Sequence, residues 1–241
     1  NTAAGLKEKH EEIISSHQAK LSGLKQQQGA MRDLKIDFDH TSIHPGKLLI
    51  EARQINFAYR PESPLWKKPL DFTLYSHDRI HLLGDNGAGK TTLIKLLTGS
   101  LCPSCGTIRR ADFQWIYLDQ DYTQVNAACS IEELAATHNR QHLAVHEVRL
   151  RLNRFLFPSN TWDKPCHALS GGEKLRLYLC CLMLSNQTPD LIILDEPTNN
   201  LDLSSLQVLT QTLKHYRGSL LVISHDRYFV EEIGVSGKKF M

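Results

Sequence analysis

The most constraining feature of the sequence is a glycine-rich stretch at residues 83–92, which reads LGDNGAGKTT. It matches the pattern G-x-x-x-x-G-K-[ST] and lies between an apolar-rich run at 79–83 and a helix-like run at 92–98. A loop in this context aims backbone N–H groups at an anion, and the dipole of the following helix favours negative charge. The stretch therefore predicts a nucleoside triphosphate site.

The residues of this loop have distinct expected tasks. Lys90 is expected to reach the β- and γ-phosphates, and the Thr91 hydroxyl to bind Mg²⁺. ATP and Mg²⁺ are therefore the predicted cofactors. The predicted phosphate-loop contacts are Gly84, Asp85, Asn86, Gly87, Ala88, Gly89, Lys90, Thr91 and Thr92.

A second informative stretch, LIILDE at residues 191–196, is an apolar run that ends in two carboxylates. Four consecutive apolar residues suit a strand buried on both faces, and ligands gather at the carboxyl ends of such strands. Asp195 is then predicted to lie beside Mg²⁺. Glu196 is predicted to act as the general base that polarises the attacking water.

The stretch LSGGE at residues 169–173 predicts a second helix start that can bind an anion. Ser170 is expected to cap the helix, and the glycines at 171 and 172 to expose N–H groups. One bound nucleotide does not need two such sites in one chain. We therefore expect this second site, Ser170, Gly171, Gly172 and Glu173, to close over a nucleotide held by a partner.

The rest of the chain from residue 47 alternates between strand-like and helix-like patterns, which predicts a mostly parallel α/β core. Strands are expected at 48–52, 55–59, 70–75, 79–83, 107–110, 114–118, 191–194 and 219–223, and helices at 92–98, 130–155, 170–184 and 203–215. Arg149, Arg151 and Arg154 are interpreted as a solvated helix face.

Composition excludes several classes of protein. The 241 residues are 41% hydrophobic, which fits one large or two small domains. The net charge of +2 argues neither for nor against a nucleic-acid partner. No run of 18 apolar residues is present, so we expect no membrane insertion. The six cysteines form no disulfide framework, and Cys102 and Cys105 lack a second ligand pair for zinc. A cytoplasmic protein is the expectation.

Residues 1–46 differ in pattern from the rest of the chain. Apolar residues recur there at seven- and three-residue intervals among Lys, Glu and Gln, which predicts a long amphipathic helix with a narrow apolar seam. It is either a frayed terminal helix or half of a helical hairpin. Because the chain begins at Asn1 rather than Met, we expect its natural beginning to have been removed.

Taken in order, the motifs at 84–91, Gln120, 169–173, 194–197, 201–202 and 224–226 resemble those of the ATP-binding cassette (ABC) ATPases, over residues 47–232. This resemblance implies that Gln120 bridges Mg²⁺ and the attacking water and that His225 holds the γ-phosphate. It also implies that Asp202 acts across a dimer and that Ser170 and Gly172 contact the opposite γ-phosphate. Tyr59 would stack on adenine; the alternative is a plain aromatic at a strand end.

The stretches EPTNNLD (196–202) and SHDRYF (224–229), with Glu173, resemble more narrowly the ABC-F family, twin-cassette proteins that act on the ribosome. Residues 1–46 would then be the C-terminal part of the helical linker between the cassettes. Residues 47–241 would be a cassette with a helical subdomain at about 125–182. Asn200, where the family often has His, leaves the subfamily open.

The resemblance implies a P-loop core with an antiparallel β subdomain and an α-helical subdomain. Its expected partners are a second cassette, in the same full-length chain or a homodimer, and the ribosome with tRNA. A translation factor or an antibiotic-resistance factor is expected. The alternative is the ATPase subunit of a membrane transporter, disfavoured by the short spacing between Gln120 and Leu169. A third reading, a non-hydrolysing or DNA-associated switch, is disfavoured by Glu196 and the modest net charge.

Overall fold

The computed structural model describes residues 43–60, 63–118, 125, 128–185, 188–199 and 201–240, so the helix expected at the start of the chain falls almost wholly outside this set. The strands are β1 (Leu48–Asn56), β2 (Ala58–Arg60), β3 (Ser63–Pro64), β4 (Leu70–Tyr75), β5 (Arg79–Leu83), β6 (Cys105–Arg110), β7 (Trp115–Leu118), β8 (Leu191–Asp195), β9 (Ser219–Ile223) and β10 (Gly237–Phe240). The helices are α2 (Lys90–Thr98), α3 (Ile131–Thr137), α4 (Val145–Arg154), α5 (Gly171–Leu184), α6 (Leu203–His215) and α7 (Arg227–Glu232), with 3₁₀ turns at Ser159–Thr161 and Cys166–Ala168.

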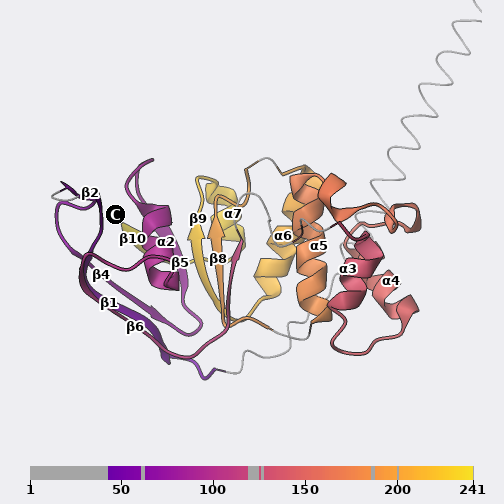
Figure 1. Cartoon of the computed structure of the whole chain (residues 1–241), viewed down its shortest axis with the longest axis horizontal. Coiled ribbons are helices and arrows are strands. Elements are labelled where there is room, and N and C mark those ends of the chain that lie inside the picture. Colours follow the sequence, from indigo (N-terminus) through magenta and orange to yellow (C-terminus); the bar gives the residue numbers. More distant parts are fainter. Residues whose placement is uncertain are drawn as a thin grey trace, which may run out of the picture.

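The centre of the fold is a parallel sheet in the order β10-β5-β9-β8-β7. Every residue of β8 and β9 is buried. Because side chains alternate along a strand, Leu191 and Ile193 pack in the cluster around α2, whereas Ile192 and Leu194 pack in the cluster that includes α5 and α6. Figure 1 shows α2 on one side of this sheet and α5 and α6 on the other.

A smaller antiparallel sheet in the order β4-β1-β6 covers the outer side of α2 (Figure 1). The two strands expected at 48–52 and 55–59 are here one long strand, β1, followed by the short β2. The pairing of β1 with β4 is irregular between Ala52 and Ile55, where Gln54 has a φ of 49°. A bulge of this kind inserts an extra residue and interrupts the alternation, so the sequence pattern splits in two.

The single helix expected over 130–155 is wrong, because the structure has two helices, α3 and α4. The predicted Ser130 cap is confirmed, since its hydroxyl accepts the Glu133 N–H. The break follows Thr137: the Asn139 side chain binds both backbone groups of Leu143, at 2.8 and 3.0 Å, and His142 has a φ of 53°. An asparagine that bonds the local backbone in this way competes with helix formation.

These elements confirm the predicted fold class, a P-loop α/β core with an antiparallel β subdomain and an α-helical part.

Arg149 is a partial exception to the predicted solvated helix face, since it bonds Glu132 at 2.7 Å and lies over the Trp162 ring. Within the described residues, no helix combines the length and apolarity needed to cross a bilayer.

Candidate functional site

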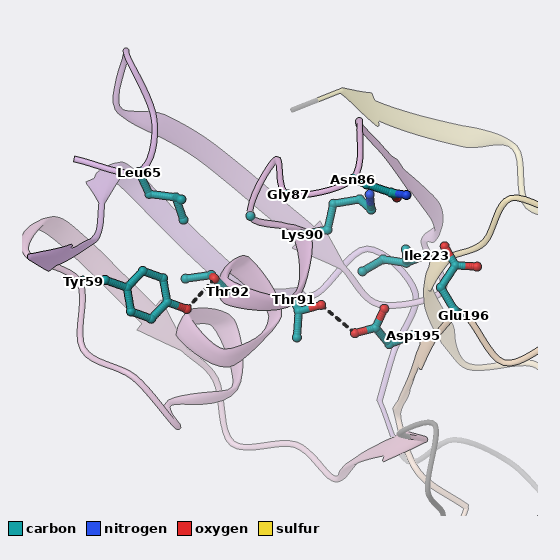
Figure 2. A pocket seen from close by; sticks show the side chains of 11 residues that line it. Tyr59, Leu65, Asn86, Gly87, Lys90, Thr91, Thr92, Asp195, Glu196 and Ile223 are labelled. Atoms are coloured by element: carbon teal, nitrogen blue, oxygen red, sulfur yellow. Dashed lines mark hydrogen bonds between the residues drawn. The ribbon is translucent and has the colours of Figure 1, made fainter. Parts of the chain in front are cut away.

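A cavity of about 420 Å³ lies where β8 and β9 end, beside the first turn of α2. Ligands of parallel α/β proteins bind at this edge of the sheet. The lining residues are Tyr59, Leu65, Asn86, Gly87, Gly89, Lys90, Thr91, Thr92, Asp195, Glu196 and Ile223 (Figure 2). The structure thus brings together residues that the sequence predicted from stretches more than 100 positions apart.

The first turn of α2 is suited to an anion. Gly89 occupies the N-cap position with a φ of 93°, contributes no capping side chain, and is followed by no acidic residue in the first turn. By contrast, α5, α6 and α7 are capped by Ser170, Asp202 and Asp226. An uncapped helix start leaves N–H donors and the positive end of the helix dipole for a ligand.

The loop before α2 is held by hydrogen bonds at both ends. The Lys90 ammonium donates to the carbonyl oxygens of Gly84 and Asp85, at 2.8 and 3.0 Å. The Trp66 indole N–H donates to the Ala88 carbonyl at 2.8 Å, and the Trp66 backbone is itself held by the Asn56 side chain. The conformation of the loop is therefore tied to the antiparallel sheet.

Asp195 lies at the end of β8 and is buried, with 8% of its surface exposed. Its Oδ2 atom accepts hydrogen bonds from the Thr91 hydroxyl at 2.8 Å (Figure 2) and from the Tyr117 hydroxyl at 3.0 Å. Hydroxyl and carboxylate oxygens are suitable Mg²⁺ ligands, and the ion usually takes its other ligands from water and substrate phosphates. The oxygen atoms of Thr91 and Asp195 therefore suit Mg²⁺ as ligands. No group of three or more His, Cys, Asp or Glu side chains in the described part of the chain could hold a metal ion.

Glu196 and His225 form a pair at the edge of the cavity. Glu196 has a φ of 49°, which is uncommon for a residue with a side chain, and its N–H bonds the Ile223 carbonyl at 2.9 Å. Its carboxylate lies 3.2 Å from the His225 Nε2 atom and accepts the His225 backbone N–H at 3.3 Å. Strained backbone of this kind is often found at functional sites.

Tyr59 lies at the other end of the cavity, next to Leu65 (Figure 2). The residue is 66% exposed, and its ring meets Phe57 edge to face, with ring centroids 4.8 Å apart. The Tyr59 hydroxyl and the Thr92 hydroxyl are hydrogen-bonded at 2.8 Å. This bond fixes the ring beside α2 and leaves much of its surface accessible.

The Ser170 group forms a separate site at the starts of α5 and α6, and its members do not line the cavity. Ser170 is exposed, and a reciprocal pair of hydrogen bonds joins it to Glu173 at 2.8 and 3.3 Å. Because the Ser170 oxygen accepts one of these bonds, its own proton remains available to a ligand. Gly172 is buried against Ser205, which the Asp202 carboxylate caps.

Two carboxyl groups in this second site have shifted pKa values. Burial raises the pKa of Glu173, but hydrogen bonds from Ser170 and Lys164 outweigh it, so the pKa lies below its ordinary value. Burial likewise raises the pKa of Asp202, and the bonds from Ser205 and Ser204 bring it below its ordinary value. Both groups therefore carry negative charge at neutral pH. Gln120 lies outside the described residues.

A family model described as ABC transporter matches residues 67–199, more than half of the chain. The chain belongs to this family. It is an ATP-binding cassette, as the motif order predicted.

The cassette is similar to curated proteins and to solved structures. It is 36% identical over 212 residues to the ATP-binding protein Uup of Haemophilus influenzae, covering 86% of this chain and 32% of Uup. It is 30% identical over 212 residues to ABC transporter F family member 5 of Arabidopsis thaliana, covering 84% of this chain and 29% of that protein. The cassette thus spans about a third of the length of these relatives.

A solved dimer of the ATP-binding cassette MJ0796 in a post-hydrolysis state, with ADP and Pi, superposes with a TM-score of 0.60. It shares 16% identity, and the match covers 80% of this chain and 94% of that one. This likeness shows the common fold.

Several residues in or next to these sites are not among the predicted ones. Leu65 and Trp66 fall between the strands predicted at 55–59 and 70–75, and no local signal marks them. Tyr117 could have been found, because it lies near the carboxyl end of a predicted strand, where ligand-site residues collect. Arg176, which donates to the Ser205 hydroxyl behind the second site, gave no signal of burial, since arginines in helices are mostly exposed.

Proposed function

We propose that this cassette binds ATP with Mg²⁺, closes with a second cassette and hydrolyses ATP to ADP and phosphate. The observation that carries the proposal is that Thr91, Asp195 and Glu196 line one cavity, with the His225 imidazole 3.2 Å from the Glu196 carboxylate. Phosphoryl transfer to water needs oxygen ligands for the metal, which Thr91 and Asp195 offer. It also needs a base for the attacking water and a donor for the phosphate, and the Glu196 carboxylate and the His225 imidazole suit these two tasks.

Nucleotide binding would use the full length of the cavity. The adenine ring stacks on Tyr59, and the triphosphate binds the N–H groups of residues 84–92 with the Lys90 ammonium on the β- and γ-phosphates. Thr91 and Asp195, with Gln120, hold Mg²⁺, which when bound offsets the charge that develops on the phosphate oxygens.

Hydrolysis would depend on Glu196. Its carboxylate accepts a proton from the attacking water, and the neighbouring His225 imidazole donates to the γ-phosphate. The 3.2 Å contact between the two side chains keeps both at the same end of the cavity. Asp195 and Glu196 thus have separate tasks, one toward the metal and one toward water.

The second cassette would complete the site. Ser170, Gly171 and Gly172 are then the contacts to the γ-phosphate of the opposite nucleotide, Glu173 holds the Ser170 loop, and Asp202 acts across the interface. The exposure of Ser170 and its free proton support this role. A second cassette can come from the same full-length chain or from another copy.

The site of action that we propose is the ribosome, in the cytoplasm, as a translation or antibiotic-resistance factor of ABC-F type. Support comes from the similarity to a protein named ABC transporter F family member 5 and from the EPTNNLD and SHDRYF stretches. Residues 1–46 would be part of the linker between cassettes, and contact with tRNA would be made by the full-length protein. The competing function is the ATPase subunit of a membrane transporter.

Glu196→Gln tests the catalytic assignment. Hydrolysis should fall by about 100-fold or more, since a positioned base contributes about 10²–10⁴-fold, while ATP binding is retained. Glu232→Gln, an exposed acid on α7, is the matched control and should hydrolyse normally. Normal hydrolysis by Glu196→Gln would remove Glu196 from its role.

Two further measurements test the partners. The rate of ATP hydrolysis per molecule of this chain should rise with its concentration, because each site needs an opposing Ser170 group. A high, concentration-independent rate refutes the shared site. In the full-length protein, Glu196→Gln is combined with the matching change in the other cassette. Sedimentation with ribosomes in ATP supports the ribosomal function, and sedimentation with membranes supports the transporter.

A further inference from the structure

The Asp195 carboxylate is held by two hydroxyl groups from different parts of the fold. Thr91, in the first turn of α2, and Tyr117, on β7, both donate to the same oxygen atom, Oδ2, at 2.8 and 3.0 Å. Oδ1 receives neither bond. The two bonds therefore restrict rotation of the carboxyl group about its Cβ–Cγ bond and hold Oδ2 near Thr91 and Tyr117.

The fold makes the Tyr117 contact possible. β7 is the last strand of the sheet, and it runs parallel to β8 with Tyr117 opposite Ile193. The tyrosine side chain is long enough to reach two residues further along β8, to Asp195. Its ring packs against the hydrophobic cluster around α2, so the position of the hydroxyl is set by the core.

We propose that Tyr117 is a positioning residue of the magnesium site, acting through Asp195. This inference rests on the proposed function, in which Thr91 and Asp195 hold Mg²⁺. Tyr117 does not line the cavity, so it need not touch the nucleotide. The Thr91 hydroxyl can bind the metal through its oxygen while its proton stays on Asp195. Tyr117 adds a second anchor for the same carboxylate, from a different element of the fold. Removing a residue that orients a metal ligand in this way typically lowers metal affinity about 10- to 100-fold.

The test is Tyr117→Phe, which keeps the ring and removes only the hydroxyl. ADP affinity is measured by displacement of a fluorescent ADP at increasing free Mg²⁺ and in EDTA, so the readout does not depend on turnover. The midpoint is the free Mg²⁺ concentration at which half of the Mg²⁺-dependent gain in ADP affinity is reached. We expect this midpoint to rise about tenfold in the variant. ADP affinity in EDTA should stay unchanged, which also establishes that the variant is folded. Tyr75→Phe, on β4 away from the cavity, is the control and should behave as the wild type.

Other outcomes would overturn the inference. An unchanged midpoint means that the phenol does not position Asp195, and a lower midpoint means that it only weakens the charge of the carboxylate. Thr91→Ala, measured in parallel, separates this inference from the proposed function. If Thr91→Ala raises the midpoint and Tyr117→Phe does not, only the role of Tyr117 fails. If neither changes it, the proposed magnesium site fails as well.

Discussion

Arg176 on α5 and Ser205 on α6 are joined by a buried hydrogen bond of 3.1 Å. Ser205 also donates to the Asp202 carboxylate, and the Arg176 guanidinium donates to the carbonyl oxygens of Phe155 and Leu156 at 3.2 and 3.1 Å. Burial lowers the pKa of Arg176, but an arginine remains charged in proteins. One buried cation therefore connects the start of α6, the body of α5 and the end of α4.

Replacing this cation should destabilise the fold. Arg176→Met leaves the Phe155 and Leu156 carbonyls and the Ser205 hydroxyl without their donor, so we expect the free energy of unfolding to fall by about 2–4 kcal/mol. Urea unfolding measures it. Arg154→Met, at an exposed position near the end of α4, should change stability by about 0.5 kcal/mol or less. Equal effects of the two variants would contradict a structural role for Arg176.

The adjacent glycines at the start of α5 should respond differently to alanine. A Cβ at Gly172 would lie 2.6 Å from the Ser205 hydroxyl and 3.1 Å from the Asp202 carboxylate, whereas a Cβ at Gly171 would meet nothing within 4 Å. Gly172→Ala should therefore cost about 1–3 kcal/mol by forcing α5 away from α6. Gly171→Ala should be neutral or stabilising by up to about 1 kcal/mol. Thermal unfolding of both variants is the measurement, and a destabilised Gly171→Ala would contradict this packing.

Two glycines of the phosphate loop form a second matched pair. Gly87 and Gly89 both have positive φ, at 82° and 93°, so alanine at either costs about 1–2 kcal/mol of backbone strain. Only at Gly89 would the new Cβ clash, at 2.7 Å from Leu65 and 2.9 Å from the Trp66 indole nitrogen. We expect Gly89→Ala to lose about 1–3 kcal/mol more than Gly87→Ala in urea unfolding without nucleotide. The reverse order would show that the loop does not pack on Trp66.

The charge of Glu173 should make stability depend on pH. Because its pKa is lower in the folded than in the unfolded chain, its contribution is complete above the unfolded pKa of about 4.3 and is lost as pH falls through the folded value. Glu173→Gln keeps an acceptor for the Ser170 N–H but loses the ion pair with Lys164, at 3.2 Å. The free energy of unfolding of the wild type should exceed that of this variant by about 1 kcal/mol or less at pH 7, and the difference should shrink as pH falls through the folded pKa. Unfolding free energies from pH 7 to 3 test this, and a constant difference would refute it.

The sequence by itself determined the parts of this protein that depend on neighbouring residues. Residues 84–91, the apolar run before Asp195 and the Ser170 cap are each set by a local pattern: glycines where φ is positive, consecutive apolar residues in a doubly covered strand, a hydroxyl before a helix. The same local reading was wrong at 130–155, because Asn139 bonds Leu143 and interrupts a pattern that otherwise continues.

Tertiary structure alone decided which distant side chains meet. Tyr117 and Thr91 converge on Asp195 because β7 lies beside β8 in the sheet and α2 begins at the same edge. Arg176 is buried because α5 packs on α6 through Gly172 and Ser205. A sequence pattern specifies the period and ends of an element, whereas these contacts depend on how elements far apart in the chain pack on one another.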